Sequence, residues 1–265
     1  MVFVGLFLVF LGVMIVHELG HAVAMAYYGI PIQAAGVGIP IPGLSLKFHL
    51  YTPSPEYRHK LFPEGLVITL SPLLLGAYVQ PAAEGEERVK TLPYRAEAEI
   101  YGAGVWSNTL SALILFIFLR LYAFGFNQDR YGFLLCGVVM VLAVGLWKYK
   151  TVFCAFGVPV LSILLIALLS FLVLQSGASK TFSGPVGIVR LMQESTTALD
   201  VLKWGFILSL GIGLTNMLPF LPLDGGHTAM AIVRRHCPRH QHRIERVSMM
   251  IGIGFILFVL LNDVL

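Results

Sequence analysis

The sequence predicts a multi-pass α-helical membrane protein with about six transmembrane helices and a small membrane-associated β element after the first helix. Of the 265 residues, 57% are hydrophobic and 12% are charged, and the mean hydropathy is +0.82. An ordinary soluble domain carries roughly 25% charged residues. Composition therefore favours a chain embedded in a bilayer, and we expect residues 1–265 to form a single integral membrane domain.

Six apolar stretches support this fold class. A helix that rises about 1.5 Å per residue needs about 20 apolar residues to cross roughly 30 Å of hydrocarbon. The stretches that approach or meet this length are residues 2–28, 100–120, 131–147, 151–174, 203–224 and 247–264. We expect the first, second and fifth to be core helices, and residues 131–174 to form an additional helical hairpin.

The distribution of basic residues predicts an orientation. Lys and Arg accumulate on the cytoplasmic side of membrane proteins. Most of the 18 basic residues lie on one side if the N-terminus is outside, so both termini are predicted outside, in a cell membrane. The first stretch has no basic residue before it and no small-residue cleavage pattern, which favours a retained helix over a signal peptide. The net charge of +4 is explained by the flanking loops, so nucleic acid is not an expected partner.

Two histidines and a glutamate interrupt the first apolar stretch, in the sequence MIVHELGHAVA at residues 14–24. On a helix His17 and His21 share a face and can both bind one ion, while Glu18 lies beside them, within reach of a water molecule there. Ionisable residues are costly inside a membrane and indicate function. Hydrogen bonding between helices is the alternative, but it does not explain three such residues in one turn.

A third ligand is expected from another helix, because catalytic zinc sites usually combine three protein ligands with one open position. The fifth stretch supplies Asp224, within NMLPFLPLDGGH at residues 216–227. Within or beside the predicted spans, the only other acidic residues are Glu18 and, at the C-terminal end, Asp263.

Backbone around Asp224 should be irregular. Pro219 and Pro222 remove backbone donors, and the glycines after Asp224 permit unusual dihedral angles, so we expect a broken helix or an extended passage. Such backbone is tolerated at membrane depth where it is buried in protein or lines a wet cavity. A proline-kinked helix that ends in a capping turn is the alternative.

These motifs resemble the site-2 protease family of intramembrane zinc metalloproteases, of the M50 type. The resemblance rests on HELGH, on NMLPFLPLDGGH, and on two further segments in the expected order, GAGVWSNTLSA at residues 102–112 and SGPVGIVRL at residues 183–191. Many bacterial relatives carry a PDZ domain where this chain has the hairpin 131–174. PDZ-like control of substrate entry is therefore not expected.

Site roles follow from the resemblance and the residue types. His17, His21 and Asp224 are expected to hold one zinc ion, and Glu18 to take a proton from water and deliver it to the leaving amine. Asn108 and Asn216 could donate hydrogen bonds to the substrate backbone or the tetrahedral oxyanion. Hydrogen bonds between packed helices are an equal alternative for these two asparagines.

The segments after the first helix have partial β character. Residues 29–50 carry the Gly and Pro punctuation of a short sheet, and residues 66–79 are a further strand or a re-entrant segment. An edge strand beside the helix that carries His17 could bind an unwound substrate by strand addition. A simple interfacial hairpin is the alternative.

From the outer side His17 follows about 15 uncharged positions, or roughly 22 Å of helix, so we expect zinc toward the cytoplasmic side.

Two charged segments have simpler interpretations. Residues 234–246 contain Cys237 and three histidines among arginines, and we interpret this segment as a basic loop for anionic lipid headgroups rather than a second metal site. Residues 83–88 are expected to form a solvated loop. The three cysteines form no framework and are expected to be packing residues.

The predicted function is zinc-dependent cleavage of a transmembrane or juxtamembrane segment in membrane-tethered proteins. Its partners would be a membrane-spanning protein substrate and the lipid bilayer. Two alternatives remain at this stage: a membrane metal-ion transporter, and an inactive relative that binds membrane helices without cutting them. A transporter would be expected to show paired halves or an additional polar pathway.

Overall fold

The computed structural model describes residues 2–38, 40–54, 59–72, 76–119 and 197–264. Among these, residues Phe7–Tyr27 and Tyr94–Leu119 form helices long and apolar enough to cross a membrane. The predicted hairpin 131–174 and the segment 183–191 lie outside the described residues, as do Cys136 and Cys154. The number of six membrane spans therefore stays a prediction.

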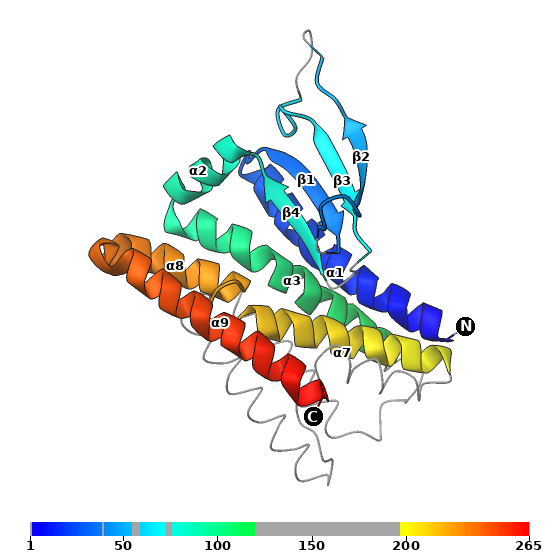
Figure 1. Ribbon diagram of the computed structural model, residues 1–265. Coiled ribbons are helices and arrows are strands. Elements are labelled where there is room, and N and C mark those ends of the chain that lie inside the picture. The colour runs from blue at the N-terminus through cyan, green and yellow to red at the C-terminus, as the bar shows by residue number, and fades with distance from the viewer. Residues whose placement is uncertain (1, 39, 55–58, 73–75, 120–196, 265) are drawn as a thin grey trace.

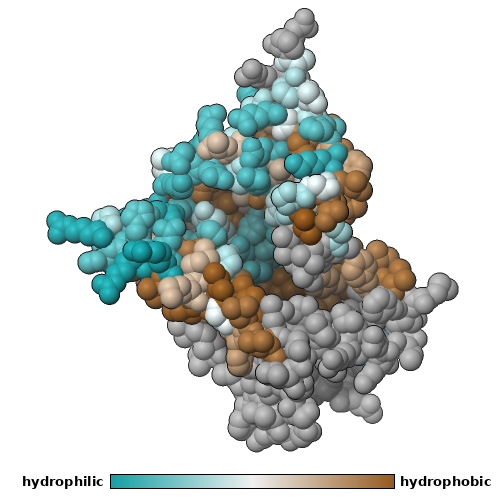
Figure 2. Space-filling view, in the orientation of Figure 1, coloured by the Kyte–Doolittle hydropathy of each residue, from teal (hydrophilic) through white to brown (hydrophobic). Residues whose placement is uncertain are grey.

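Helices and a small sheet make up the described part of the chain (Figure 1). The helices are α1 (Val2–Tyr27), α2 (Ala83–Thr91), α3 (Tyr94–Leu119), α7 (Ala198–Asn216), α8 (Asp224–His236) and α9 (Gln241–Val264), with a 3₁₀ turn, η3 (Pro238–His240), between the last two. Figure 1 shows both chain ends on the side away from the turn between α8 and α9. Hydrophilic residues gather over the sheet, α2 and this turn, as Figure 2 shows.

The second core helix begins earlier than its hydropathy indicates. α3 starts at Tyr94 rather than at residue 100, because Pro93 accepts the first helical hydrogen bonds through its carbonyl oxygen. Glu97 and Glu99 consequently lie inside the helix. The prediction that Glu18, Asp224 and Asp263 are the only acidic residues of these spans is therefore wrong.

The break in the fifth apolar stretch is confirmed. α7 ends at Asn216, and Asp224 is the first residue of α8, so residues 217–223 separate two helices. At the other end of α7, Thr197 and Asp200 form a reciprocal capping box.

Two segments predicted as loops are helical. Residues 83–88 belong to α2, whose Gly85 and Val89 are buried against the sheet side of the fold. α9 starts at Gln241 rather than at residue 247, so residues 234–246 comprise the end of α8, η3 and the first turn of α9. Both segments were predicted as loops because they are rich in charged residues, but charged residues are compatible with an exposed helix.

The predicted β element is a sheet of four strands. The strands are β1 (Ile32–Val37), β2 (Leu46–Tyr51), β3 (Leu66–Leu70) and β4 (Ala77–Pro81), in the order β2-β3-β1-β4. β1 and β3 are parallel, whereas β4 pairs with β1, and β2 with β3, in antiparallel fashion. The segment 66–79 thus contains one strand and the start of the next. Both β2 and β4 are edge strands, and β4 packs against α1.

Two apolar clusters join α3 to the other parts of the fold. One lies between α3 and α7 and includes Val105, Phe206 and Leu214. The other joins the end of α1 to β1, α2 and α3 through residues such as Met25 and Ile100. α3 takes part in both clusters and is the common support for the sheet and the other helices.

α1 and α3 cross closely because both carry glycine at the crossing. A Cβ atom at Gly20 would lie 2.5 Å from the backbone oxygen of Ala103 and 2.7 Å from Ser107 Oγ. Van der Waals contact forbids such distances, so a side chain there would push the two helices apart.

We expect Gly20→Ala to lower the free energy of unfolding by about 1–3 kcal/mol, as overpacked sites do. Gly12→Ala is the matched control in the same helix, because a Cβ there meets nothing within 4 Å. The control should be neutral or stabilising by up to about 1 kcal/mol, from helix propensity. Unfolding in detergent, monitored by circular dichroism, measures both; equal midpoints would contradict the close crossing.

Candidate metal centre

Three potential ligand atoms converge at the junction of α1, α3 and α8. His17 and His21 lie one turn apart on α1 and are 4% and 7% exposed. Oδ2 of Asp224 lies 3.0 Å from His17 Nε2 and 3.3 Å from His21 Nε2, and the two Nε2 atoms are 3.3 Å apart. Within the described residues this is the one group of at least three His, Cys, Asp or Glu residues that could hold a metal ion.

The spacing of these atoms fits a zinc ion. Nitrogen and oxygen ligands at about 2.0–2.2 Å from a tetrahedral zinc stand about 3.3–3.6 Å from one another. The measured separations of 3.0–3.3 Å are close to that requirement. Asp224 Oδ2 is moreover buried, and it faces the two imidazole Nε2 atoms with no other hydrogen-bond donor among the described residues. A buried carboxylate between two imidazoles whose Nε2 atoms carry no proton needs compensation, and a cation would provide it.

Each imidazole is hydrogen-bonded through Nδ1, the ring nitrogen that faces away from the place where the three ligand atoms converge. His21 Nδ1 lies 2.8 Å from the carbonyl oxygen of Ile100, so it carries the proton and leaves Nε2 free to bind a metal. His17 Nδ1 lies 3.2 Å from the side-chain amide of Asn108. This is the outer shell that metal-binding histidines usually have.

The Asn108 amide can support the same tautomer at His17. Asn108 is fully buried, its Nδ2 faces His17, and its Oδ1 has no partner among the described residues. Turning the amide by 180° places Oδ1 against a protonated His17 Nδ1 and leaves Nδ2, instead of Oδ1, without a partner among these residues. In that orientation His17 presents an unprotonated Nε2 to the metal position, as His21 does.

Gly104 provides the space in which the two imidazoles meet. A Cβ atom there would lie 2.4 Å from His21 Nε2 and 2.5 Å from His17 Nε2. The absence of a side chain on α3 at this level therefore allows the ligands of α1 to converge beside it.

Glu18 lies on the more open side of the group. Its side chain is partly exposed, whereas both histidines are buried. The backbone N–H of Val79, in β4, faces the Glu18 carboxylate. The edge of the sheet is thus placed directly beside the acidic residue of the HELGH motif.

Family comparison agrees with this geometry. The family model for peptidase family M50 matches residues 5–259, nearly the whole chain. The chain belongs to peptidase family M50. Members of this family are zinc-dependent and membrane-embedded, which agrees with the metal-binding geometry and with the two long apolar helices.

Curated relatives are similar over part of this M50 chain. Proteins named "Putative zinc metalloprotease" match from Helicobacter pylori strain J99, at 29% identity over 108 residues, and from Fusobacterium nucleatum, at 29% over 111 residues. Another from Brucella suis is 34% identical over 87 residues. These matches cover 38%, 39% and 30% of this chain, and 31%, 33% and 23% of the relatives. The matches thus span about a third or less of each relative.

The second asparagine singled out in the sequence is placed differently from Asn108. Asn216 is the last residue of α7, and its Nδ2 donates to the carbonyl oxygen of Ile212 at 3.1 Å, within its own helix. A contact of either asparagine with substrate stays a prediction. The position of Asn108 behind His17 favours a role in orienting that ligand.

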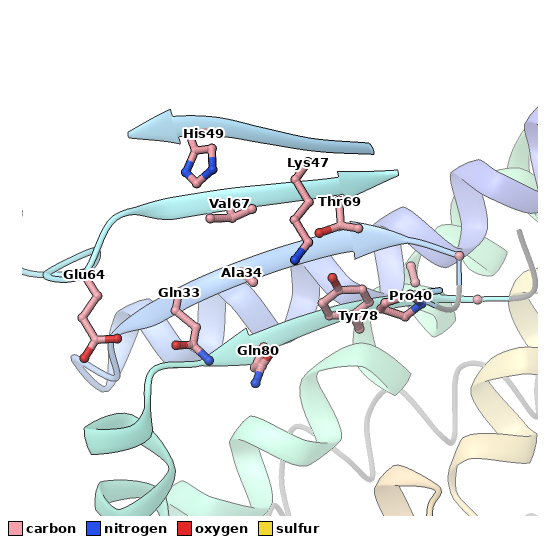
Figure 3. A pocket seen from close by; sticks show the side chains of 13 residues that line it. Gln33, Ala34, Pro40, Lys47, His49, Glu64, Val67, Thr69, Tyr78 and Gln80 are labelled. Atoms are coloured by element: carbon pink, nitrogen blue, oxygen red, sulfur yellow. The ribbon is translucent and has the colours of Figure 1, made fainter. Parts of the chain in front are cut away.

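A groove with polar and apolar lining residues lies on the open face of the sheet (Figure 3). It has a volume of about 840 Å³ and is lined by all four strands, including Tyr78 and Gln80 of β4. No member of the metal group lines it. Side chains alternate along β2: Lys47 and His49 point into the groove, whereas Phe48 is exposed and does not line it. This alternation of polar and apolar residues is the feature of the sequence that could have predicted the groove.

Four residues that the sequence did not single out as part of the site join α3 to α8 beside the metal group. Buried Glu97 pairs with Arg234, and the ring of Tyr101 stacks on His227. Their spacing could have indicated them: Tyr101 lies three residues from Gly104 and His227 three residues from Asp224, so each shares a helix face with a residue of the metal group's surroundings.

We expect Asn108→Ala to weaken zinc binding about 10–100-fold, because outer-shell partners of metal ligands carry effects of this size. Asn108→Asp should retain the affinity, since its carboxylate accepts from His17 Nδ1–H. Ser111→Ala is the control, because Ser111 bonds within its own helix, to Ser107 O at 2.9 Å. Competition with a chromophoric chelator measures each affinity; a loss in Asn108→Asp equal to that in Asn108→Ala would refute the acceptor role.

Proposed function

We propose that this chain is a zinc-dependent endopeptidase that cleaves a transmembrane or juxtamembrane segment of membrane-tethered proteins. The observation that carries the proposal is the convergence of His17 Nε2, His21 Nε2 and Asp224 Oδ2 at 3.0–3.3 Å, from helices about 200 residues apart in sequence. Membership of family M50 and the names of the curated relatives support the same reaction.

Four side chains would perform the chemistry. His17, His21 and Asp224 would hold zinc, which when bound polarises a scissile carbonyl and lowers the pKa of water to about 7. Glu18, on the open side, would accept the proton of the attacking water and return it to the departing amine. The Val79 N–H would orient the Glu18 carboxylate for both transfers.

The outer edge of β4 would hold the substrate. Residues of an antiparallel strand direct their peptide groups alternately toward the partner strand and away from it. Because the Val79 N–H points to Glu18, its carbonyl also faces the outer edge, away from β1. An unwound substrate segment that adds to β4 there would lie beside Glu18, with main-chain hydrogen bonds supplying affinity.

Membrane placement follows the same proposal. We infer a multi-pass protein with both termini outside and the metal group toward the cytoplasmic side, as the basic residues indicate. The exposed arginines of η3 and the start of α9, Arg239, Arg243 and Arg246, would contact anionic lipid headgroups there.

The geometry favours hydrolysis over ion transport or helix binding alone. Within the described residues the metal-ligating side chains form one compact group rather than a pathway, and a partly exposed glutamate adjoins it. Neither transport of an ion nor binding of a helix requires that glutamate.

The first test measures zinc content and cleavage in purified, detergent-solubilised protein. We expect about one zinc per chain, as in a three-ligand catalytic site, and its substantial loss in Asp224→Ala. Glu18→Gln should retain zinc while cleavage of a reporter transmembrane peptide falls by at least about 100-fold, the usual scale of general-base catalysis.

Each result decides one part of this proposal. Zinc absent from the wild type after reconstitution would refute the zinc enzyme, and zinc retained in Asp224→Ala would show that Asp224 is not the third ligand. Cleavage that persists in Glu18→Gln would remove Glu18 from the reaction. Asp200→Ala is a matched acidic control, because Asp200 caps the distant end of α7.

Orientation of Glu18 by β4 predicts a loss of cleavage in Val79→Pro. Proline removes the N–H that faces Glu18, and the fold should tolerate it because the sheet does not use that N–H. We expect cleavage to fall at least about tenfold, the effect of one hydrogen bond to a charged group, with zinc content unchanged. Val79→Ala keeps the N–H and serves as the control; equal activity in the two variants would count against this role of β4.

A further inference from the structure

Helix α8 is attached to α3 by an ion pair and a ring stack that do not include the metal group. Arg234 donates a hydrogen bond to Glu97, and the side chains of these residues are only 24% and 1% exposed; Arg235 lies 3.9 Å from the other oxygen of Glu97. The rings of Tyr101 and His227 stack at 4.9 Å between centroids, with an interplanar angle of 14°. Both contacts join the same two helices.

The two contacts and the metal group form successive levels of one interface. On α3, Glu97, Tyr101 and Gly104 recur at helical spacing and so share a face. On α8 the partners Arg234 and His227 and the ligand Asp224 also share a face, in the reverse order. The helices therefore run antiparallel, with the ion pair first, the stacked rings next and the metal group last.

Asp224 depends on this interface because its connection to α7 is not helical. Residues 217–223 separate the two helices and include Pro219 and Pro222. The direction of α8 must then be set by its packing, and its buried residues, among them Met230 and Ala231, lie on the packed side.

The same part of α3 also positions a ligand of α1. Ile100, next to Tyr101, accepts a hydrogen bond from His21 Nδ1 at 2.8 Å through its carbonyl oxygen. Two adjacent residues of α3 thus contact the helix that carries the histidines and the helix that carries the aspartate.

We propose that the Tyr101–His227 stack and the Glu97–Arg234 ion pair are a positioning device that sets Asp224 against His17 and His21 and thereby fixes the zinc affinity. This inference rests on the proposed zinc function of the group. In this proposal neither pair contacts zinc or substrate. His227 acts through the face of its ring, and Glu97 and Arg234 act by setting the direction of α8.

The stack is tested with a pair of substitutions at one position. His227→Phe keeps a flat ring against Tyr101 and should retain zinc affinity to within about threefold, since stacking needs no ring nitrogen. His227→Ala removes the ring and should weaken zinc binding about 10–100-fold. An equal loss in both variants would show that a nitrogen of His227 is needed, and would overturn positioning by stacking.

The ion pair is tested by a double-mutant cycle on zinc affinity. Glu97→Gln and Arg234→Gln should each weaken binding, and the double variant should bind no more weakly than Glu97→Gln alone, because Glu97→Gln already removes the pair with Arg234 together with the longer one with Arg235. Arg239→Gln is the control, an exposed arginine of the same basic segment that pairs with no acidic group among the described residues. Additive losses in the cycle would overturn the coupling.

Two further measurements separate failure of the positioning device from failure of the proposed function. Unfolding of each metal-free variant shows whether it folds, and a parallel zinc assay of Asp224→Ala shows whether the zinc site itself exists. A wild type without zinc would remove the proposed function itself. Zinc bound by the wild type and lost in Asp224→Ala, with unchanged affinity in the His227→Ala and Arg234→Gln variants, would refute the positioning device alone. If a Glu97 variant fails to fold, the His227 pair still decides the inference.

Discussion

The convergence of three ligand atoms within 3.3 Å of one another is the constraint on which the described structure depends. The atoms come from α1 and α8, which only tertiary packing can bring together. α3 is the support for both helices, and the close crossing at Gly20 and the open space at Gly104 let the histidines reach the position of Asp224. The lack of a side chain at Gly20 and Gly104 thus leaves room for a metal site.

Polar groups at this level of an apolar bundle are costly unless each has a partner. His21 is bonded to the Ile100 carbonyl, and His17 to Asn108. Glu97 is buried but paired with Arg234. Asp224 Oδ2 is buried against the two Nε2 atoms, and no other described group donates a hydrogen bond to it. If both imidazoles carry their proton on Nδ1, this carboxylate has no donor, and a cation would complete the set.

The sheet divides the surroundings of the metal group into two sides. The two histidine ligands are buried, whereas Glu18 is partly exposed and faces β4. An acid–base residue must meet both water and substrate, while ligands must be shielded and fixed. The same short motif on α1 meets both demands, because adjacent residues of a helix point in directions about 100° apart.

The sequence alone predicted the residues of the metal group and the break before Asp224. The i, i+4 spacing of His17 and His21 fixes a shared helix face, and Pro219 with Pro222 disfavours a continuous helix, since both are local effects. Only the tertiary structure decided that Asn108 supports His17, that Glu97 and Tyr101 fasten α8, and that β4 turns its edge to Glu18. Those contacts depend on the crossing and relative rotation of packed elements, which hydrophobic periodicity does not specify.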